Sequence, residues 1–398
     1  MKEGWQTKKL GEICDIERGG SPRPIQNFIT TDSNGINWVK IGDATASGKY
    51  IYKTEEKIRP EGAKRSRMVY EGDFVLSNSM SFGRPYIMKT TGCIHDGWLV
   101  LHQPKVDPDY LYYVLSSDLV FDQFDRLAAG STVRNLNIGL AKSVEIPYPP
   151  LPEQQRIVGI LDEAFDGIAT AKANAEKNLK NARALFESHL QFVFTQRGEG
   201  WVDTPLGDVC GFVRGPFGGS LKKSIFVADG YAVYEQQHAI YDQFDDVRYF
   251  IDEAKFNEMK RFELLPNDLI MSCSGTMGRV AIVPNGIKRG IINQALLKLT
   301  PTAKIANAFL KLWMESEAFQ DALKEYSGGA AIQNVASVKI LKEIRIALPS
   351  VDKQEHVVAE LETLREETQH LESVYQQKLA ALDDLKKSLL HQAFTGAL

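Results

Sequence analysis

Apolar residues recur at steps of four and three along two stretches of the chain, which is the spacing of one face of a helix. The first stretch runs from Glu153 to about Thr195 and contains no proline. Its apolar or small positions are Ile157, Leu161, Ala164, Ile168, Ala171, Ala175, Ala182 and Leu185. The second has its pattern at Val357, Leu361, Leu364, Thr368, Leu371, Tyr375, Leu382, Leu385 and Leu389. We therefore expect two long helices of roughly 60 Å each.

The remaining residues have the pattern of short strands, turns and short helices. Residues 74–77 and 98–101 are strand-like, and a short amphipathic helix begins at Asp109. Strand-like segments at 268–272 and 295–299 and a helix around Phe309 follow later in the chain. Proline disfavours helix in the residue before it, so each long helix must begin after its proline hinge. We expect a first module at 1–150, a spacer helix at 151–196, a second module at 197–349 and a second spacer helix at 350–398.

The two modules are copies of one unit. Trp5 and Trp201 are 196 residues apart, and at the same offset residues 10–14 match 206–210. Further on, residues 77–84 match 272–279, and the offset stays between 195 and 200 throughout the repeat. The matches fall on turns and core-like positions, whereas the residues between them diverge. This pattern favours one scaffold with two different surfaces; a duplicated structural module without a binding role is the alternative.

Two amphipathic helices of this length must cover each other's apolar faces in water. If a two-fold axis relates the copies, the helices run antiparallel with the modules at opposite ends. The predicted fold class is α+β, with two tandem, pseudo-two-fold-related mixed α/β modules separated by two long antiparallel coiled-coil helices. Apolar residues beside the seams suggest that partner helices complete a bundle; packing against the protein's own modules is the alternative. The predicted partner-binding residues are Leu161, Phe165, Ile168, Leu179, Phe186, Leu361, Leu364, Leu371, Leu379 and Leu382.

Composition argues for a cytoplasmic protein, because no apolar run approaches membrane-spanning length and the first residues lack a signal-peptide core. The net charge of −4 argues weakly against nucleic-acid binding. Residues 1–150 carry 19 basic and 18 acidic side chains, a net of +1, and residues 196–349 carry 18 of each. The acidity lies mostly in 350–398, which carries 5 basic and 9 acidic side chains. The four cysteines have no metal-ligand spacing, and no phosphate loop or adenine-methyltransferase tetrapeptide occurs.

Three segments carry a resemblance to a known family. They are the opening Trp5-x(4)-Leu10-Gly11-Glu12-x-Cys14, the helix start at 149–158 and the ending at 389–398. Over its whole length the chain resembles the specificity subunit of a type I restriction-modification system. Residues 352–356 depart mildly from the first copy of the helix start, which casts little doubt on the fold.

The resemblance implies two target-recognition domains that each bind one half of a bipartite site in double-stranded DNA. It implies helices that fix the spacing between the half-sites and dock two methyltransferase subunits, and through them restriction subunits. The subunit itself would catalyse nothing and hold no metal or cofactor. S-adenosylmethionine and ATP are expected only on partner subunits. The alternatives are a coiled-coil scaffold with two protein- or carbohydrate-binding modules, and a stand-alone nuclease, for which no site can be assembled.

Four loop segments in each module have the residue types that contact DNA. Arginine pairs with guanine, asparagine or glutamine with adenine, and lysine, arginine and glycine positions suit phosphates. The first segment is a Gly/Ser loop, for which an ordinary tight turn is the alternative. Its candidates are Arg18, Ser21 and Arg23 in the first module, and Arg214, Ser220, Lys222 and Lys223 in the second.

The second segment keeps its register while its chemistry changes, from Lys40 in one module to Gln236, Gln237 and His238 in the other. This favours contact with DNA over a core position. The third is a serine-rich loop, in which hydroxyls could simply cap turns. Its candidates are Asn78, Ser79, Arg84, Ser274, Thr276 and Arg279.

The fourth segment exchanges Arg134 for Gln333 before a shared asparagine that could be structural. A basic run at 57–67 is the best candidate for phosphate contact, with Lys64, Arg65 and Arg67; a solvated loop is an equal alternative. The bases of the target do not follow from the sequence.

Overall fold

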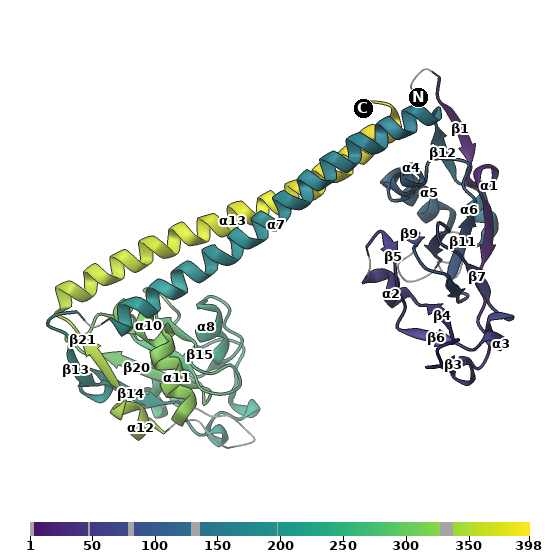
Figure 1. Ribbon diagram of the computed structural model, residues 1–398. Coiled ribbons are helices and arrows are strands. Elements are labelled where there is room, and N and C mark those ends of the chain that lie inside the picture. Colours follow the sequence, from purple (N-terminus) through teal and green to yellow (C-terminus); the bar gives the residue numbers. More distant parts are fainter. Residues whose placement is uncertain (1–3, 47, 79–82, 129–135, 197, 327–336) are drawn as a thin grey trace. The chain divides into compact units, whose positions relative to one another are not determined.

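The computed structural model describes residues 4–46, 48–78, 83–128, 136–196, 198–326 and 337–398. The chain forms two compact units (Figure 1). One unit is Met1–Glu176 with Gln377–Leu398, and the other is Lys177–Gln376. Each unit therefore contains one module and part of each long helix.

The first module is built on two five-stranded mixed sheets. One sheet has the order β2 (Asp15–Arg18), β11 (Trp98–His102), β8 (Phe74–Ser77), β9 (Pro85–Met88) and β5 (Tyr50–Ile51). The other has the order β3 (Ile29–Thr30), β6 (Glu56–Ile58), β4 (Ile36–Val39), β10 (Gly92–Ile94) and β7 (Arg67–Val69). A short antiparallel pair joins β1 (Gln6–Lys9) to β12 (Glu145–Tyr148).

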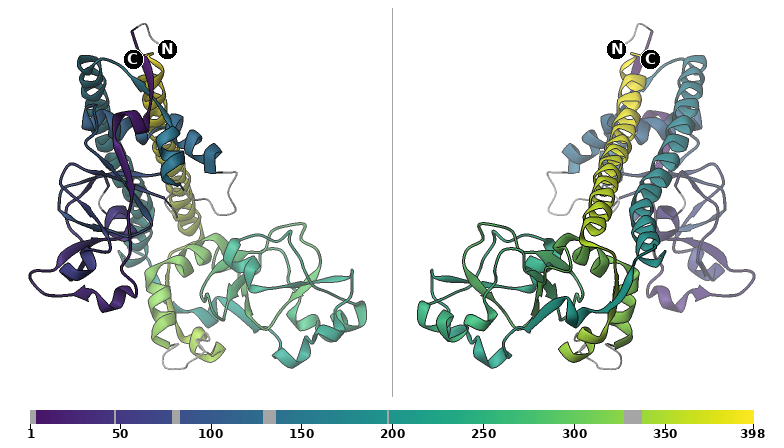
Figure 2. Two further views of the ribbon diagram at one scale, coloured as in Figure 1. Left: turned by 90° about the vertical axis from the view of Figure 1, so that its right-hand side faces the viewer. Right: turned by 90° about the vertical axis from the view of Figure 1, so that its left-hand side faces the viewer.

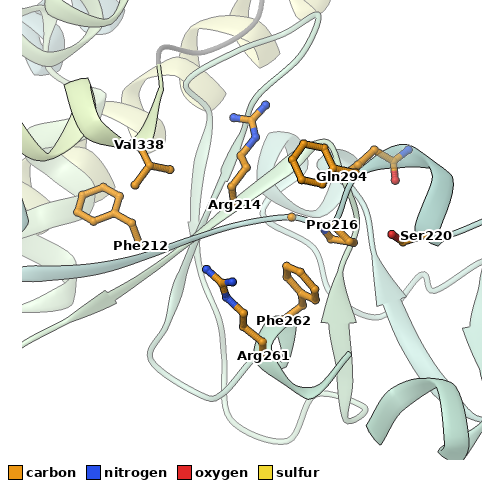
Figure 3. A pocket seen from close by; sticks show the side chains of 10 residues that line it. Phe212, Arg214, Pro216, Ser220, Arg261, Phe262, Gln294 and Val338 are labelled. Atoms are coloured by element: carbon orange, nitrogen blue, oxygen red, sulfur yellow. The ribbon is translucent and has the colours of Figure 1, made fainter. Parts of the chain in front are cut away.

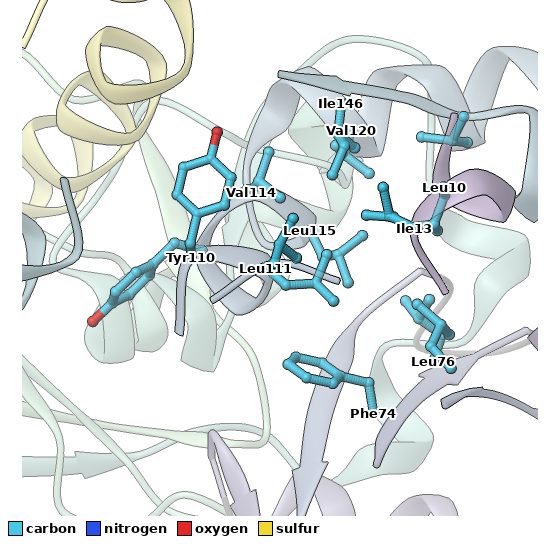
Figure 4. Packing of buried hydrophobic residues seen from close by; sticks show 14 of the residues in the cluster. Leu10, Ile13, Phe74, Leu76, Tyr110, Leu111, Val114, Leu115, Val120 and Ile146 are labelled. Atoms are coloured by element: carbon cyan, nitrogen blue, oxygen red, sulfur yellow. The ribbon is translucent and has the colours of Figure 1, made fainter. Parts of the chain in front are cut away.

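Alternating side chains of the central strands supply two separate cores. Side chains of a strand point to opposite faces in turn. Phe74 and Leu76 of β8 therefore enter a core with Leu10 and Leu111, whereas Val75 packs on the other face with Trp98. Figure 4 shows the first of these cores. It is covered by α1 (Leu10–Ile13), α4 (Pro108–Leu115), α5 (Asp118–Ala128) and α6 (Ile138–Ser143), and α2 (Ile41–Thr45) and α3 (Pro60–Ala63) lie in the loops.

The second module repeats this plan with fewer strands in each sheet. One sheet has the order β14 (Cys210–Arg214), β20 (Leu296–Pro301), β17 (Leu269–Ser272) and β18 (Val280–Ile282). The other has the order β16 (Phe250–Ile251), β15 (Tyr231–Tyr234) and β19 (Gly290–Ile292), and β13 (Val202–Pro205) pairs with β21 (Arg345–Leu348). Its helices, drawn in teal to green and seen from two sides in Figure 2, are α8 (Gln236–Tyr241), α9 (Glu253–Glu258), α10 (Asn307–Glu315), α11 (Glu317–Tyr326) and α12 (Val338–Glu343).

The predicted spacer helices are α7 (Leu151–Thr195) and α13 (Val351–Thr395), each of 45 residues. Their contacts run antiparallel in both units. In the first unit α7 contributes Arg156 and then Lys172, which contact Leu398 and Asp383 of the C-terminal segment. In the second unit the side chains of Arg183 and His189 contact Glu372 and Glu360 of α13, at 2.8 Å and 3.3 Å.

The C-terminal end of each long helix completes the core of a module. Leu390 and Phe394 of α13 belong to the first core, where the Phe394 ring lies 5.5 Å from that of Tyr110. Phe194 of α7 belongs to the corresponding core of the second unit, with its ring 5.3 Å from that of Phe309. Each module therefore packs directly on the end of a long helix, and the two are not joined merely by a free linker.

The proline hinges are held by a buried glutamine at the start of each long helix. Gln154 Oε1 accepts a hydrogen bond from the backbone N–H of Asp107 at 2.8 Å, and its Nε2 donates to the Pro149 carbonyl at 2.8 Å. Gln354 makes the equivalent bonds with Ala306 and Pro349. The matching pair explains why glutamine follows both hinges, because each must satisfy buried backbone groups.

The predicted apolar seam is only partly buried. Ala175, Ala182 and Thr368 lie at most 5% exposed, as a close seam requires. Leu185, Leu371 and Leu385 are 50%, 39% and 46% exposed, so the prediction that they lie in the seam is wrong. An α-helix of 3.6 residues per turn drifts away from a strict 3.5-residue repeat, and a single neighbouring helix covers only a narrow stripe.

No helix in the described part of the chain combines the length and apolar character that crossing a bilayer requires.

Candidate nucleic-acid interface

In both modules the first loop leaves its strand through a glycine that backbone packing requires. A Cβ atom on Gly19 would lie 2.0 Å from the carbonyl oxygen of His95, and one on Gly215 would lie 1.8 Å from that of Asn293. The N–H of Gly19 donates to Trp98 and the N–H of Gly215 to Leu296. The loop is therefore pressed against the segment that enters the central strand β11 or β20.

In the first module, Asp96 joins residues of the first and third candidate segments. Its carboxylate accepts hydrogen bonds from Ser21 Oγ at 2.7 Å and Arg23 Nη2 at 3.2 Å. Its backbone carbonyl accepts from Arg18 Nε at 3.0 Å and Asn78 Nδ2 at 2.9 Å. The hydrogen bond from Ser21 is the largest influence on the Asp96 carboxyl and lowers its pKa, with Arg23 adding to it.

The predicted basic run lies beside this loop. A Cβ on Gly20 would be 3.2 Å from the backbone oxygen of Arg65, whose guanidinium lies 5.9 Å from the Phe28 ring. Arg67 pairs with Glu17 at 3.1 Å, so its charge is partly neutralised. Lys64 is exposed, and its side chain has no hydrogen bond or ion pair within the described segments. Of the run, Lys64 and Arg65 are the residues best placed for phosphate contact.

In the second module, the corresponding loop borders a cavity of about 680 Å³ (Figure 3). The lining includes Arg214, Phe217 and Ser220 from the loop, with Arg261 from the short 3-10 helix Lys260–Phe262 and Gln294 from the segment before β20. Phe217 is 92% exposed. Lys222 and Lys223 are exposed beyond the loop. Guanidinium, amide and hydroxyl groups around an open hollow are the donors that nucleic-acid contacts use.

The second candidate segment is mostly structural, which corrects the prediction for its central residues. His238 is 1% exposed, and its Nδ1 lies 2.9 Å from the backbone nitrogen of Glu235. It occupies the place of Asp43, which accepts from the backbone N–H of Lys40 at 2.8 Å. Both side chains thus cap the first turn of a short helix, so His238 cannot reach a base edge from its buried position.

The neighbours of these caps are also held within the protein. Lys40 pairs with Glu56 at 2.9 Å, and this hydrogen bond is the main reason that the Lys40 pKa is raised. Gln237 donates to the backbone oxygen of Asp246 at 3.3 Å. Gln236 accepts from Ser274 Oγ at 3.3 Å, which joins the second and third segments of the second module.

The third segment contains one buried and several exposed candidates. Asn78 is 1% exposed and supports Asp96, so its predicted contact with DNA does not fit its burial. Arg84 is exposed over the Tyr86 ring, and Thr276 and Arg279 are exposed at the rim of a second hollow of about 630 Å³. Three candidates lie outside the described residues: Ser79, Arg134 and Gln333.

The predicted partner-binding residues divide into two groups. Leu161 and Leu361 are fully buried in module cores, and Ile168 is 7% exposed, so the prediction that these three face a partner is wrong. Phe165 packs against Tyr113 of the first module, and Phe186 packs against the core of the second, which fits the alternative that such residues pack on the protein's own modules. Partly or largely exposed positions remain at Leu179, Leu364, Leu371, Leu379 and Leu382. Phe192 and Val374, two of the apolar residues beside the seams from which partner helices were predicted, are exposed, and so are the predicted seam residues Leu185 and Leu385.

A family model described as "Type I restriction modification DNA specificity domain" matches residues 2–181 and again 198–380. The chain belongs to this family. Two matches to one specificity domain, with the break close to the end of α7, agree with the internal repeat.

Relatives of the specificity-domain family match along the whole chain. The specificity subunit of the type I restriction enzyme EcoBI from Escherichia coli is 22% identical, with 100% of this chain and 87% of the relative covered. The putative MjaX specificity subunit from Methanocaldococcus jannaschii is 23% identical, with 100% and 94% covered.

Two solved structures share the fold. The HsdS subunit from Thermoanaerobacter tengcongensis has a TM-score of 0.68 and 20% identity, over 100% of this chain and 98% of that one. A chain from work on the assembly and conformational transition of the type I R-M system has a TM-score of 0.79 and 20% identity, over 100% and 99%. This likeness confirms the predicted α+β architecture.

Sequence reasoning missed Asp96, Phe217, Arg261 and Gln294. Only the repeat could have indicated Asp96 and Gln294, because these two residues occupy equivalent positions of the two modules, just before the central strand.

The cysteines are buried, and desolvation raises the pKa of Cys14, Cys210 and Cys273 to about 12. These thiols are therefore protonated near neutral pH. The described residues contain no cluster of side chains suited to a metal ion.

Proposed function

We propose that this specificity-domain protein is the sequence-recognition subunit of a type I restriction-modification assembly. Each module would bind one half of a bipartite target in double-stranded DNA. The observation that carries the proposal is the repeated first loop: one backbone geometry presents Arg18, Ser21 and Arg23 in one module, and Arg214, Phe217 and Ser220 in the other. A common scaffold with different polar groups suits two different half-sites.

We further propose that two methyltransferase subunits dock on α7 and α13, and that restriction subunits join through them. Exposed apolar side chains on these helices support a protein-covered surface, since single helices rarely expose several large apolar groups without a partner. Adenine methylation, with its S-adenosylmethionine, and ATP-driven steps would reside on the partner subunits. The two relatives reported above are both named as specificity subunits, in agreement with this division of roles.

DNA binding by the chain alone is expected to be weak, because the modules are near neutral. Tight binding would appear once basic partners join, and it would weaken steeply with salt as counterions are released.

The test begins with co-expression of this chain and the methyltransferase subunit of the same system. The purified assembly is then used to select DNA from a random-sequence library. The expected result is a motif of two short specific segments separated by a fixed gap, and methylome sequencing of the host should show adenine methylation at the same motif. Failure of the two proteins to co-purify, or selection without any bipartite motif, would instead favour a scaffold for protein or carbohydrate ligands.

A further inference from the structure

Asp96 and Gln294 occupy equivalent positions in the two modules. Gly19 packs on the carbonyl of His95, and Gly215 packs on that of Asn293, so His95 and Asn293 correspond. In both modules the N–H of the same glycine donates to a backbone carbonyl three residues further on, that of Trp98 or Leu296. The residue immediately after the packed carbonyl is Asp96 in one module and Gln294 in the other.

In the first module this position carries a negative charge that engages the loop. The Asp96 carboxylate binds Ser21 and Arg23, and its carbonyl oxygen accepts from Arg18. The Arg23 side chain is 80% exposed and that of Asp96 is 44% exposed, so the pair lies at the surface. A DNA phosphate that approaches Arg23 must therefore compete with an anion already in place.

In the second module the same position is neutral. Gln294 is exposed, and its side chain has no hydrogen-bond partner among the residues that the structure describes. Arg261 is likewise exposed and without an ion-pair partner in the described part of the chain. Arg214 reaches the Cys273 thiol, a neutral group. Within the described residues, therefore, no carboxylate pairs with Arg214 or Arg261, the two cationic side chains that line this cavity (Figure 3).

We infer that the position of Asp96 and Gln294 determines how strongly each module's first loop holds DNA. In the second module the cavity bounded by Arg214, Arg261 and Gln294 accepts the DNA backbone, whereas in the first module Asp96 restrains the loop. This inference rests on the proposed function and deepens it, because it states that electrostatic attraction contributes unequally to DNA binding by the two modules.

The chemistry of the cavity suits DNA. Arginine forms strong, geometrically defined hydrogen bonds with phosphate oxygens, and Ser220 can donate a further one. Phe217 presents an exposed ring beside these groups, where it can contact a deoxyribose of the DNA backbone. A protein that neutralises one more phosphate releases about 0.9 more counterion from duplex DNA, which changes the salt dependence by a measurable amount.

The experiment uses the assembled complex and its selected target DNA, with dissociation constants measured over a series of salt concentrations. Gln294→Asp places a carboxylate in the second module, and Asp96→Asn removes the one in the first while its amide oxygen can still accept from Ser21. Asn285→Asp adds the same negative charge in the exposed turn between β18 and β19, outside the residues that line the cavity.

Gln294→Asp should weaken binding about 10-fold and lower the magnitude of the salt slope by about one. Asp96→Asn should tighten binding and raise the slope. Asn285→Asp should leave the slope unchanged. If Gln294→Asp behaves like Asn285→Asp, the inference is overturned, even where Asp96→Asn fails to assemble. If the wild-type complex selects no bipartite DNA, the proposed function itself fails, which is a different outcome.

Discussion

Gly215 lies where any other residue would place a methyl group 1.8 Å from the carbonyl oxygen of Asn293. The neighbouring atom is backbone, so it cannot turn away as a flexible side chain can. Gly219, in the same loop, has open space around the corresponding position. The two glycines therefore separate a packing requirement from the general effect of adding a side chain to this loop.

Gly215→Ala should destabilise the protein by about 1–3 kcal/mol, the usual cost of overpacking a close contact. Gly219→Ala should change the free energy of unfolding by less than about 0.5 kcal/mol. Denaturant unfolding of the two variants tests this, and equal stabilities would show that the loop can move away from β20.

Asp96 gives a dependence on pH whose sign follows from its lowered pKa. A carboxyl with a pKa below its ordinary value stabilises the fold while ionised, so its contribution is complete above the ordinary pKa and is lost as pH falls through the lowered one. Wild type should therefore exceed Asp96→Asn in stability between pH 5 and pH 7, and the difference should shrink below about pH 4. A difference that stays constant down to pH 3 in urea titrations would contradict the assigned hydrogen bonds.

Residue types alone could not distinguish side chains at the candidate DNA-binding surface from side chains that hold the backbone in place. Arg18, Arg23 and Arg214 were predicted from composition and loop position, and the structure places them at the candidate surface. His238 and Asn78 have equally suitable chemistry, but they are buried because the backbone needed their hydrogen bonds. Such use of a polar side chain depends on which backbone groups are left unpaired, and a single sequence does not show that.

At the scale of elements, the hydrophobic pattern of the chain predicted more of the structure than residue types did at the scale of single residues. The strand-like segment at 74–77 is β8, and the heptads from Glu153 to Thr195 lie in α7, as the order of apolar residues predicted. The exposed positions Leu185 and Leu371 were misassigned, because the period of a helix fixes a face but not the width of the neighbour that covers it. The role of Gln154 was also hidden, since its partners are 5 and 47 residues away.

Gln154→Ala should lower the free energy of unfolding by about 2–4 kcal/mol, because it leaves the Asp107 N–H and the Pro149 carbonyl buried without their partner. Gln155→Ala changes an exposed residue of the same type in the same turn and should have an effect below about 0.5 kcal/mol. Thermal unfolding of both variants measures the difference. Similar melting temperatures would mean that water replaces the glutamine at the hinge.

At the scale of the whole molecule, the repeat was the most informative feature of the sequence. It indicated two modules, two helices and two different surfaces, and the architecture and the double family match agree with it. What it could not indicate is how module and helix share a core. Leu161 and Leu361 were expected at a partner surface, yet each lies inside a module core, because the helices pack on the modules as well as on each other.

The remaining exposed apolar residues are therefore the ones to test for docking of methyltransferase subunits. Phe192 on α7 is 58% exposed and stacks only partly on His189, with ring centroids 6.1 Å apart. Phe192→Lys should leave the stability of the isolated chain within about 0.5 kcal/mol of wild type, since little packing is lost. It should reduce co-purification of the methyltransferase subunit, because burying a lysine in an apolar contact is costly.

Ser188→Lys adds the same charge at an exposed position of α7 without removing an apolar side chain, and it should retain the partner. Phe194→Ala, two residues beyond Phe192, removes a ring that is 7% exposed and should instead destabilise the chain by about 3–5 kcal/mol. Pull-down yields and unfolding curves of the three variants together distinguish a docking surface from a structural one. Normal partner recovery with Phe192→Lys would place the methyltransferase subunits elsewhere on the helices.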